Sequence, residues 1–312
     1  MTDDVNTVIS RQHINTICND GNVLSSRVYG PVGAPRLIIS HGNGFASDGY
    51  QVYWKSLIND FEVVVFDLRG HGQSESISLD RHTWPQMVDD YEALYSSINA
   101  SLGPQFTVGA FHSLSSVAAL GHLGKYGKRI DGLILFDPPL TTPDGNPLQA
   151  LHFKDAFGLA ERVKNRRQYF ENTTQLAQQF TKAPAFQHWD LRAYQDMASA
   201  VLKKSLQQGY PWELSCPPMF ESQMYATNTS QEYWFFLQNA LIPIKLVCGD
   251  PYSIDPQPGA LIGKHASEVF DIDYEYVPNA SHFLQLEFPE KCQEITRSFV
   301  QRCYQNSLKT NI

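Results

Sequence analysis

Ser113 is the side chain best placed to act as a nucleophile. It stands between an apolar run, residues 108–111, and a stretch of small residues, 114–120. If the first segment is a strand and the second a helix, Ser113 lies on a sharp turn with its hydroxyl exposed. The N–H of Leu114 at the start of that helix then favours an oxyanion. A single serine in this position is equally well explained as an ordinary helix N-cap.

Two further segments carry groups that suit the same chemistry. Residues 40–45 read Ser-His-Gly-Asn-Gly-Phe, and the two glycines leave the backbone free to approach a substrate. His282 follows an apolar segment and precedes a helix opened by Pro289, which is a plausible place for a general base. The chain has ten histidines, most of which we expect to be structural. The order of an early serine and a late histidine favours His282.

The elements around these residues alternate between strand-like and helix-like patterns. The strand-like runs are nearly continuous in apolar residues, which is typical of a parallel sheet covered on both faces. They are residues 37–40, 61–67, 106–111, 132–137 and 244–248, and the helix-like stretches are 84–100, 113–126 and 289–304. The alternation predicts an α/β fold, whose ligands bind at the carboxyl ends of the strands.

Residues 138–241 break this alternation. They lack a strong strand but contain helical, Gln-rich and aromatic-rich segments, including 154–179 and 191–208. A structureless loop of that length is improbable in a compact domain, so we expect a helical insertion over one end of the sheet. Its aromatic side chains either line a pocket or form the insertion's own core. They are Phe153, Phe157, Tyr169, Phe170, Phe180, Trp189, Tyr210, Trp212, Phe220 and Tyr225.

The composition narrows the class of protein. The 312 residues carry a net charge of −8, are 42% hydrophobic and contain no Lys/Arg block, which argues against disorder and against a general nucleic-acid binder. No apolar run is long enough to span a membrane, and the first residues lack the pattern of a signal peptide. The five cysteines are scattered and never spaced C-x-x-C, so we expect reduced thiols rather than disulfides or a zinc site. The composition indicates a cytoplasmic protein whose partner is a small molecule; whether it forms a homo-oligomer stays open.

Four motifs in this order resemble the α/β-hydrolase superfamily over nearly the whole chain. They are His41-Gly42 after the third strand, residues 66–74 after the fourth, the Ser113 turn after the fifth, and residues 281–287 near the end. The resemblance implies a mostly parallel, doubly wound sheet formed by residues 1–137 and 242–312. It identifies residues 138–241 as a helical cap or lid. It also makes residues 67–72 an architectural tight turn.

Carried over from the family, Ser113 is the nucleophile and His282 its base. The oxyanion hole is then formed by the main-chain N–H groups of Asn43 and Leu114. This arrangement implies acyl transfer through an acyl-enzyme, without a metal or an organic cofactor. The flanking residues depart from the family's G-x-S-x-G turn, because Phe111 and Ser115 occupy the glycine positions.

The third member of the triad is less clearly marked. Many members carry the acid shortly after the seventh strand, but here Tyr252 occupies that place and Asp250 comes two positions early. Other members carry it after the sixth strand, where this chain has Asp137. We prefer Asp137, with Asp250 as the alternative and Asp255 behind both.

The leading hypothesis is a serine hydrolase that cleaves a carboxylic ester of a small-to-medium apolar substrate. The aromatic insertion suggests the apolar preference. The first alternative keeps the same residues but makes the protein a C–C bond hydrolase or a cofactor-free dioxygenase. The second is a non-catalytic ligand receptor on the same fold, since a fold does not fix a function.

Overall fold

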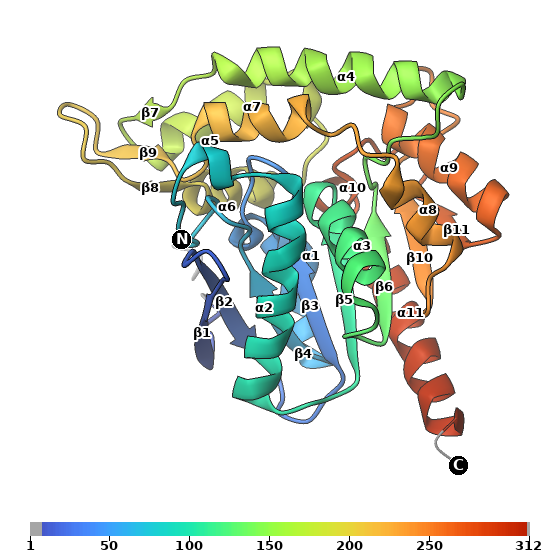
Figure 1. The fold of residues 1–312 in the computed structure, drawn as a ribbon. Helices are drawn as coiled ribbons and strands as arrows, with labels where there is room; N and C mark the ends of the chain where they lie inside the picture. The colour runs from blue at the N-terminus through green and yellow to red at the C-terminus, as the bar shows by residue number, and fades with distance from the viewer. Residues whose placement is uncertain (1–7, 311–312) are drawn as a thin grey trace.

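The computed structural model describes residues 8–310 and contains one large sheet of eight strands in the order β1-β2-β4-β3-β5-β6-β10-β11 (Figure 1). β1 and β2 pair antiparallel, β2 pairs antiparallel with β4, and all later pairs are parallel. The strands are β1 Gln12–Ile17, β2 Val23–Tyr29, β3 Arg36–Ser40, β4 Glu62–Phe66, β5 Thr107–His112, β6 Gly132–Phe136, β10 Ile244–Cys248 and β11 Asp273–Tyr276. The predicted mostly parallel α/β fold is confirmed.

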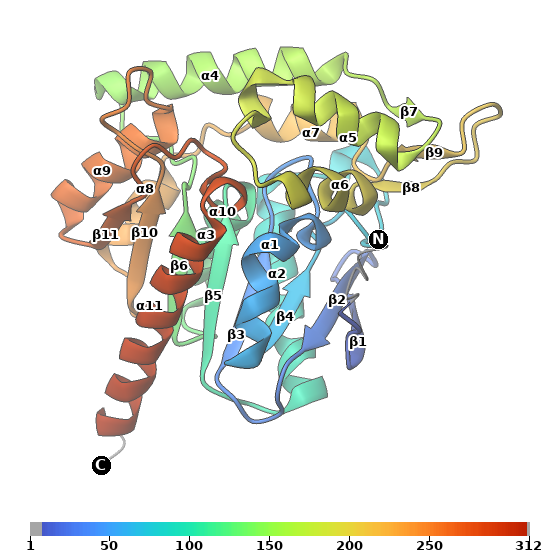
Figure 2. The ribbon, with the colours of Figure 1, turned by 180° about the vertical axis from the view of Figure 1, so that it is seen from behind.

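Helices cover both faces of this sheet, as the apolar strands require. α2 and α3 lie on one face with α8 and α9 beside them, and α1 and α11 lie on the other (Figures 1 and 2). Each face buries its own apolar cluster, because successive side chains of a strand point to opposite sides. The bounds of these helices are α1 Gln51–Trp54, α2 Trp84–Leu102, α3 Leu114–Tyr126, α8 Glu232–Gln238, α9 Pro258–Phe270 and α11 Pro289–Thr310. A short helix, α10 Leu284–Glu287, directly precedes α11.

Residues 138–241, called the insertion below, follow β6 and lead to β10. Four of their helices lie above the carboxyl ends of the large sheet's strands, whereas α8 packs against α3 (Figure 1). These four are α4 Pro147–Lys164, α5 Thr173–Lys182, α6 Leu191–Ala200 and α7 Pro218–Ala226. The insertion also contains a small antiparallel sheet, β7 Tyr169–Phe170, β9 Trp212–Leu214 and β8 Leu202–Lys204, which the sequence did not predict. Strands of two or three residues are too short to show a periodic pattern.

Two features of the described chain bear on its class. No helix within residues 8–310 is long and apolar enough to cross a membrane. All five cysteines are free thiols, each of them buried.

Candidate active site

Ser113 occupies the turn between β5 and α3. Its backbone has φ 53° and ψ −117°, a region that costs an L-residue about 1–3 kcal/mol. The strain is tolerated because the turn is fixed on both sides: the Ser113 N–H donates to the carbonyl of Phe136 at 2.9 Å, and the serine carbonyl starts the helix. Its hydroxyl makes no N-cap hydrogen bond to α3. The N-cap explanation therefore does not apply, and the hydroxyl is free to act elsewhere.

Phe111, the bulky residue in the turn, is accommodated by a glycine two positions earlier on β5. The Phe111 ring is fully buried against Phe66 and Tyr91. A Cβ added at Gly109 would lie 2.3 Å from that ring, so the missing side chain provides its space. On the other side of the turn, the Ser115 hydroxyl donates to the carbonyl of His112 and accepts from its N–H, at 2.8 and 2.9 Å. The turn thus closes without glycine at either flanking position.

His282 lies between Ser113 and Asp137. The Ser113 hydroxyl donates to its Nε2 at 3.0 Å, and its Nδ1 donates to Asp137 Oδ2 at 2.5 Å. Asp137 directly follows β6, is fully buried and also accepts from the N–H of Gly249 at 3.1 Å. The carboxylate has room because Gly259 faces it without a side chain: a Cβ there would lie 2.5 Å from Oδ2. Nucleophile, base and acid positions therefore form one hydrogen-bonded chain.

The other two candidates for the acid, Asp250 and Asp255, do not contact His282. Asp250 accepts from the backbone N–H of Tyr252 at 2.8 Å and of Asn279 at 2.9 Å, which makes it a turn-stabilising residue. Asp255 is exposed. The structure places Asp137, and neither of these two, against the His282 ring.

Asn43 and Leu114 flank Ser113 and line the same cavity. Leu114 is the first residue of α3, so its N–H belongs to the helix's unpaired first turn. Within the described chain, no acceptor engages the backbone N–H of either residue. The loop carrying Asn43 comes close to the serine because Gly42 has no side chain; a Cβ there would lie 3.2 Å from Ser113 Cβ. Two free donors near the serine are what an oxyanion needs.

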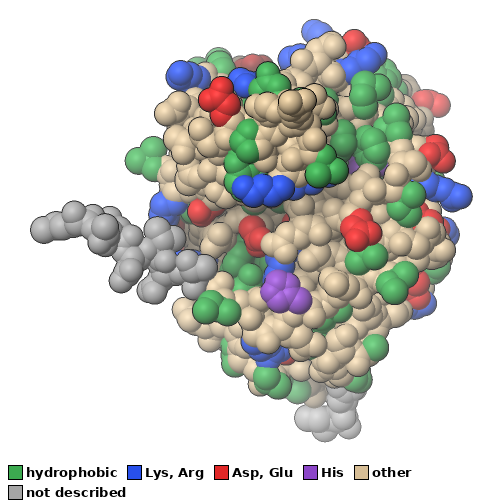
Figure 3. Space-filling model, turned by 90° about the vertical axis from the view of Figure 1, so that its left-hand side faces the viewer, with side chains coloured by type: hydrophobic (Ala, Val, Ile, Leu, Met, Phe, Trp, Pro, Cys, Tyr) green, Lys and Arg blue, Asp and Glu red, His purple; other side chains and the backbone are tan. Residues whose placement is uncertain are grey.

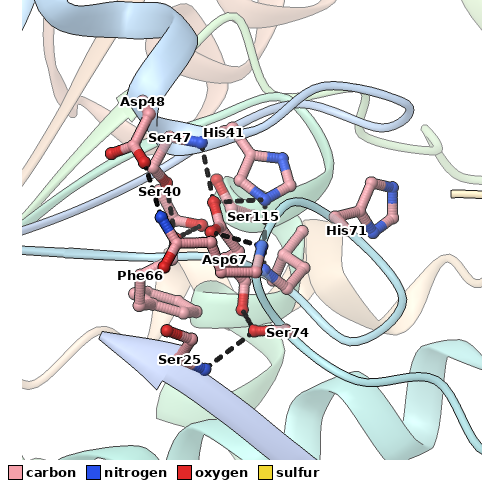
Figure 4. A network of polar contacts seen from close by, with 12 residues as sticks. Ser25, Ser40, His41, Ser47, Asp48, Phe66, Asp67, His71, Ser74 and Ser115 are labelled. Carbon is pink, nitrogen blue, oxygen red and sulfur yellow. Dashed lines mark hydrogen bonds and ion pairs between the residues drawn. The ribbon is translucent and has the colours of Figure 1, made fainter. Parts of the chain in front are cut away.

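A buried carboxylate, Asp67, fixes the loops behind this site (Figure 4). Asp67 accepts from the N–H of Ser47 at 2.8 Å and of Gln73 at 3.0 Å, and pairs with Arg27 at 2.7 Å. Burial by itself would raise the pKa of Asp67, but the charge of Arg27, together with the hydrogen bonds from Arg27 and from the Ser47 N–H, outweighs it and lowers the pKa to about 2. The predicted architectural role of residues 67–72 agrees with these contacts, which join the loops after β3 and β4.

A second buried chain, which sequence reasoning missed, joins His282 to the loop after β3 that carries Gly42 and Asn43. His112 donates from Nε2 to the carbonyl of His282 at 2.9 Å and accepts at Nδ1 from the Tyr50 hydroxyl at 2.8 Å. Tyr50 in turn accepts from the N–H of Gly42 at 3.4 Å. Burial lowers the pKa of His112 well below its ordinary value, and the His282 imidazole lowers it further, so His112 is neutral. Only its place next to Ser113 could have signalled this role.

The cavity above Ser113 has a volume of about 360 Å³ and is shared by the large sheet's strand ends and the insertion. Among the ten aromatic residues named from the sequence, only Tyr225 lines it; Phe170, Phe180 and Trp189 are buried in the core instead. Phe186, which was not named, lines it and packs edge-on against Phe283, the residue after His282. Of the two alternatives, the core of the insertion applies to Phe170, Phe180 and Trp189 and the pocket to Tyr225, whereas Phe157 and Tyr210 are exposed.

A larger cleft of about 680 Å³ opens on another face, between the insertion above and the sheet below (Figure 3). Residues 72–76 and Asp48 line it from the core, and Lys203 and Ser215 from the insertion. It contains no histidine and no serine–base pair. Ser113 and His282 both line the smaller cavity.

One cluster of potential metal ligands, His71, His82 and Cys216, is buried near the insertion. The Nε2 lone pair of His71 accepts from the N–H of Gly44 at 3.0 Å, and its Nδ1 donates to the carbonyl of Arg69 at 2.9 Å. A metal would have to displace the first of these bonds. Burial also raises the pKa of the Cys216 thiol and lowers the pKa of His82 to about 3. We assign no metal to the cluster, since hydrogen bonding already accounts for His71.

Comparisons with known proteins agree with this architecture. A family model described as an alpha/beta hydrolase family matches residues 37–294. Among solved structures, the chain is similar to an E-2-(acetamidomethylene)succinate hydrolase (18% identity, 94% of this chain and 99% of that chain, TM-score 0.74). It is also similar to a thioesterase domain from the curacin biosynthetic pathway (16%, 92% and 99%, TM-score 0.71) and to an alpha/beta hydrolase from Novosphingobium aromaticivorans (19%, 93% and 98%, TM-score 0.69). A sequence search of curated proteins found no match.

Proposed function

This chain belongs to the alpha/beta hydrolase family, and from that premise we propose that it is a serine hydrolase acting on a carboxylic ester. The observation that carries the proposal is the unbroken hydrogen-bonded chain from the Ser113 hydroxyl through His282 to the buried Asp137. A serine, a base and an orienting acid in this geometry activate a hydroxyl for attack on a carbonyl.

Each residue then has a defined step. His282 Nε2 takes the proton of Ser113 as the serine oxygen attacks the ester carbonyl, and Asp137 stabilises the imidazolium that forms. The N–H groups of Asn43 and Leu114 hold the tetrahedral oxyanion. His282 next gives the proton to the leaving alcohol, which leaves an acyl-enzyme. Water, deprotonated by the same His282, then releases the acid and restores Ser113.

The cavity supports a small-to-medium substrate with a largely apolar body. Its volume of about 360 Å³ lies at the small end of ligand sites, and Phe45, Phe186 and Phe283 form its walls beside Ser113. In this proposal the insertion acts as the cap that closes the cavity. Several proteins of similar fold are named as esterases, which favours ester chemistry as a starting point.

Labelling with a fluorophosphonate probe, together with hydrolysis of 4-nitrophenyl esters, tests the proposal. Wild-type protein should be labelled and active, whereas S113A and H282A should lose labelling and at least about 10⁴-fold in kcat. S96A, which removes an exposed hydroxyl on α2, is the matched control and should behave as wild type. A folded wild type that is neither labelled nor active would move the assignment toward a ligand receptor. Unchanged ester turnover in S113A would overturn the proposal.

A second candidate keeps the same residues but changes the bond that breaks. This candidate is a C–C bond hydrolase or a cofactor-free dioxygenase, and the aspartate after β6 favours the latter, because the chain resembles some dioxygenase members of the superfamily in that position of the acid. Turnover of diketone or hydroxyquinolone compounds, with no turnover of 4-nitrophenyl esters, would select this candidate.

A cytoplasmic location is part of the proposal. Its support is the five buried free thiols, which suit a reducing compartment. Cell fractionation with an antibody to the protein tests it, and recovery in an oxidising compartment would contradict it.

A further inference from the structure

The part of the cavity that is lined by the insertion contains a buried ion pair. Glu221 on α7 has a side chain only 5% exposed, and its Oε2 lies 2.9 Å from a terminal nitrogen of Arg166, just after α4. That nitrogen is Nη2, so Nη2 and Oε2 are ion-pair partners of each other without hydrogen-bond geometry, and within the described chain the Nε of Arg166 donates no hydrogen bond. Burial raises the pKa of Glu221, although the charge of Arg166 opposes it. Both side chains line the cavity.

Glu221 is held close to the loop after β3 that carries Asn43 and Gly44. The Asn43 side-chain amide donates to the Glu221 carbonyl at 2.9 Å, and a Cβ added at Gly44 would lie 2.4 Å from Glu221 Oε1. α7 is further anchored to the core, because the Trp84 indole donates to the carbonyl of Met224 at 3.1 Å. The Oδ1 of Asn43 is a buried acceptor without a donor. The Arg166–Glu221 ion pair therefore lies close to the proposed reaction centre and is incompletely hydrogen bonded.

The charges around this end cancel. Asp155 and Glu221 are matched by Arg162 and Arg166, all four lining the cavity. A carboxylate on the ligand would be attracted to Arg166 and repelled by Glu221, and an ammonium would meet the reverse. A buried ion pair nevertheless carries a desolvation cost, which a ligand that hydrogen bonds to both partners can relieve. An uncharged group that both donates and accepts satisfies both side chains without that repulsion.

We propose that the Arg166–Glu221 end of the cavity is a specificity subsite for an uncharged polar group of the ester substrate that both donates and accepts hydrogen bonds, such as a carboxamide or a ureido group. Its carbonyl accepts from Arg166, and its N–H donates to Glu221. This inference rests on the proposed function and narrows its substrate to an apolar body with one such group.

A panel of matched esters tests the subsite. One series consists of 4-nitrophenyl esters whose acyl chains end in methyl, carboxamide, carboxylate or ammonium at equal length. A second places the same four ends on the alcohol side of an acetate ester, followed by acid release. In one of the two series, kcat/KM for the carboxamide should exceed that of the methyl end by at least about tenfold, and should also exceed both charged ends. Preference for the methyl end in both series would overturn the inference.

Variants that remove one charge of the pair should shift the substrate preference toward opposite charged ends, carboxylate in one variant and ammonium in the other. E221Q leaves Arg166 unpaired, so the carboxylate end should gain about tenfold relative to the carboxamide. R166Q leaves Glu221 unpaired, so the ammonium end should gain instead. K164Q removes an exposed cation at the end of α4, two residues before Arg166, and should keep the wild-type ranking. An identical ranking in wild type, E221Q and R166Q would overturn the inference.

Two controls separate the possible failures. The double variant R166Q/E221Q removes both charges, so it should fold even if a single variant does not. Its preference for the carboxamide end over the methyl end should fall about tenfold, while methyl-ended esters are still hydrolysed. Methyl-ended esters also report the proposed function by themselves. If S113A hydrolyses them as wild type does, the proposed function fails; if they are hydrolysed through Ser113 without any polar preference, only the subsite fails.

Discussion

The two ends of the cavity are built in different ways. At the strand end, Ser113 and Asp137 directly follow neighbouring parallel strands, and backbone bonds from Phe136 and Gly249 fix both residues. At the insertion end, Glu221 comes from α7 and Arg166 from the turn after α4, and the two form a buried ion pair that is incompletely hydrogen bonded. The strand end therefore has the fixed geometry that catalysis needs. The insertion end has an ion pair whose hydrogen bonding a ligand can complete. Variants at the two ends should separate into losses of kcat and changes of KM.

The largest effect should come from Asp137→Asn at the strand end. Without the carboxylate, His282 loses the partner that sets its tautomer and stabilises its charged form, so kcat should fall about 10⁴-fold with little change in KM. Asp250→Asn is the matched control, because Asp250 only accepts backbone N–H groups and should cost less than about tenfold. Steady-state ester kinetics check both. A larger loss of kcat in Asp250→Asn than in Asp137→Asn would place the acid after β10.

A smaller effect is expected where the insertion meets the strand end. Phe186→Ala removes a ring that packs against Phe45 and Phe283. Because this ring contacts the apolar body of the substrate in both ground and transition states, KM should rise about 10- to 100-fold while kcat changes little. A loss confined to kcat would show instead that Phe186 positions His282, and the contrast between the two ends would fail.

The Tyr50–His112 chain offers a finer test within the strand end. Tyr50→Phe leaves His112 Nδ1 and the N–H of Gly42 without their partner, so kcat should fall about tenfold and stability by about 1–3 kcal/mol. Tyr53→Phe is the matched control: it removes an equally buried hydroxyl, bonded to Thr296 at 2.8 Å. It should lose similar stability, measured by urea unfolding, but retain kcat. Equal kcat in the two variants would reduce His112 to a structural role.

The smallest effect concerns acid stability rather than catalysis. The pKa of His82 is lowered from 6.5 to about 3, first by burial and then by Arg69. The unfolded chain therefore binds a proton between these values that the folded chain does not. The contribution of neutral His82 to folding stability is therefore complete above pH 6.5. It is lost as the pH falls toward 3, by up to about 1.4 kcal/mol per pH unit. Urea unfolding at pH 7.5 and 5.5 should show this loss as a smaller free energy of unfolding at pH 5.5. His82→Asn should reduce the slope of that free energy against pH by the equivalent of about one proton. An unchanged slope would contradict the assignment.

Local patterns were sufficient to predict the frame of the molecule. The apolar runs at residues 37–40, 132–137 and 244–248 correspond to β3, β6 and β10, because central parallel strands are apolar on both faces. The small sheet of the insertion and the position of α8 against α3 were not predictable, since two-residue strands and a short helix have no distinctive period. Phe186 escaped notice for a similar reason: a single aromatic residue shows nothing about which surface it faces.

The sequence by itself determined the alternation of strands and helices, the serine between β5 and α3, and a late histidine. These depend on local propensity and on order along the chain. Only the tertiary structure decided which aspartate meets His282, because Asp137 and Asp250 follow adjacent strands and differ in the direction of their side chains. It likewise decided that Phe111 fits over Gly109 and that Glu221 meets Arg166. Such contacts depend on the register of the strands and on the packing of helices across them, and no local pattern encodes either.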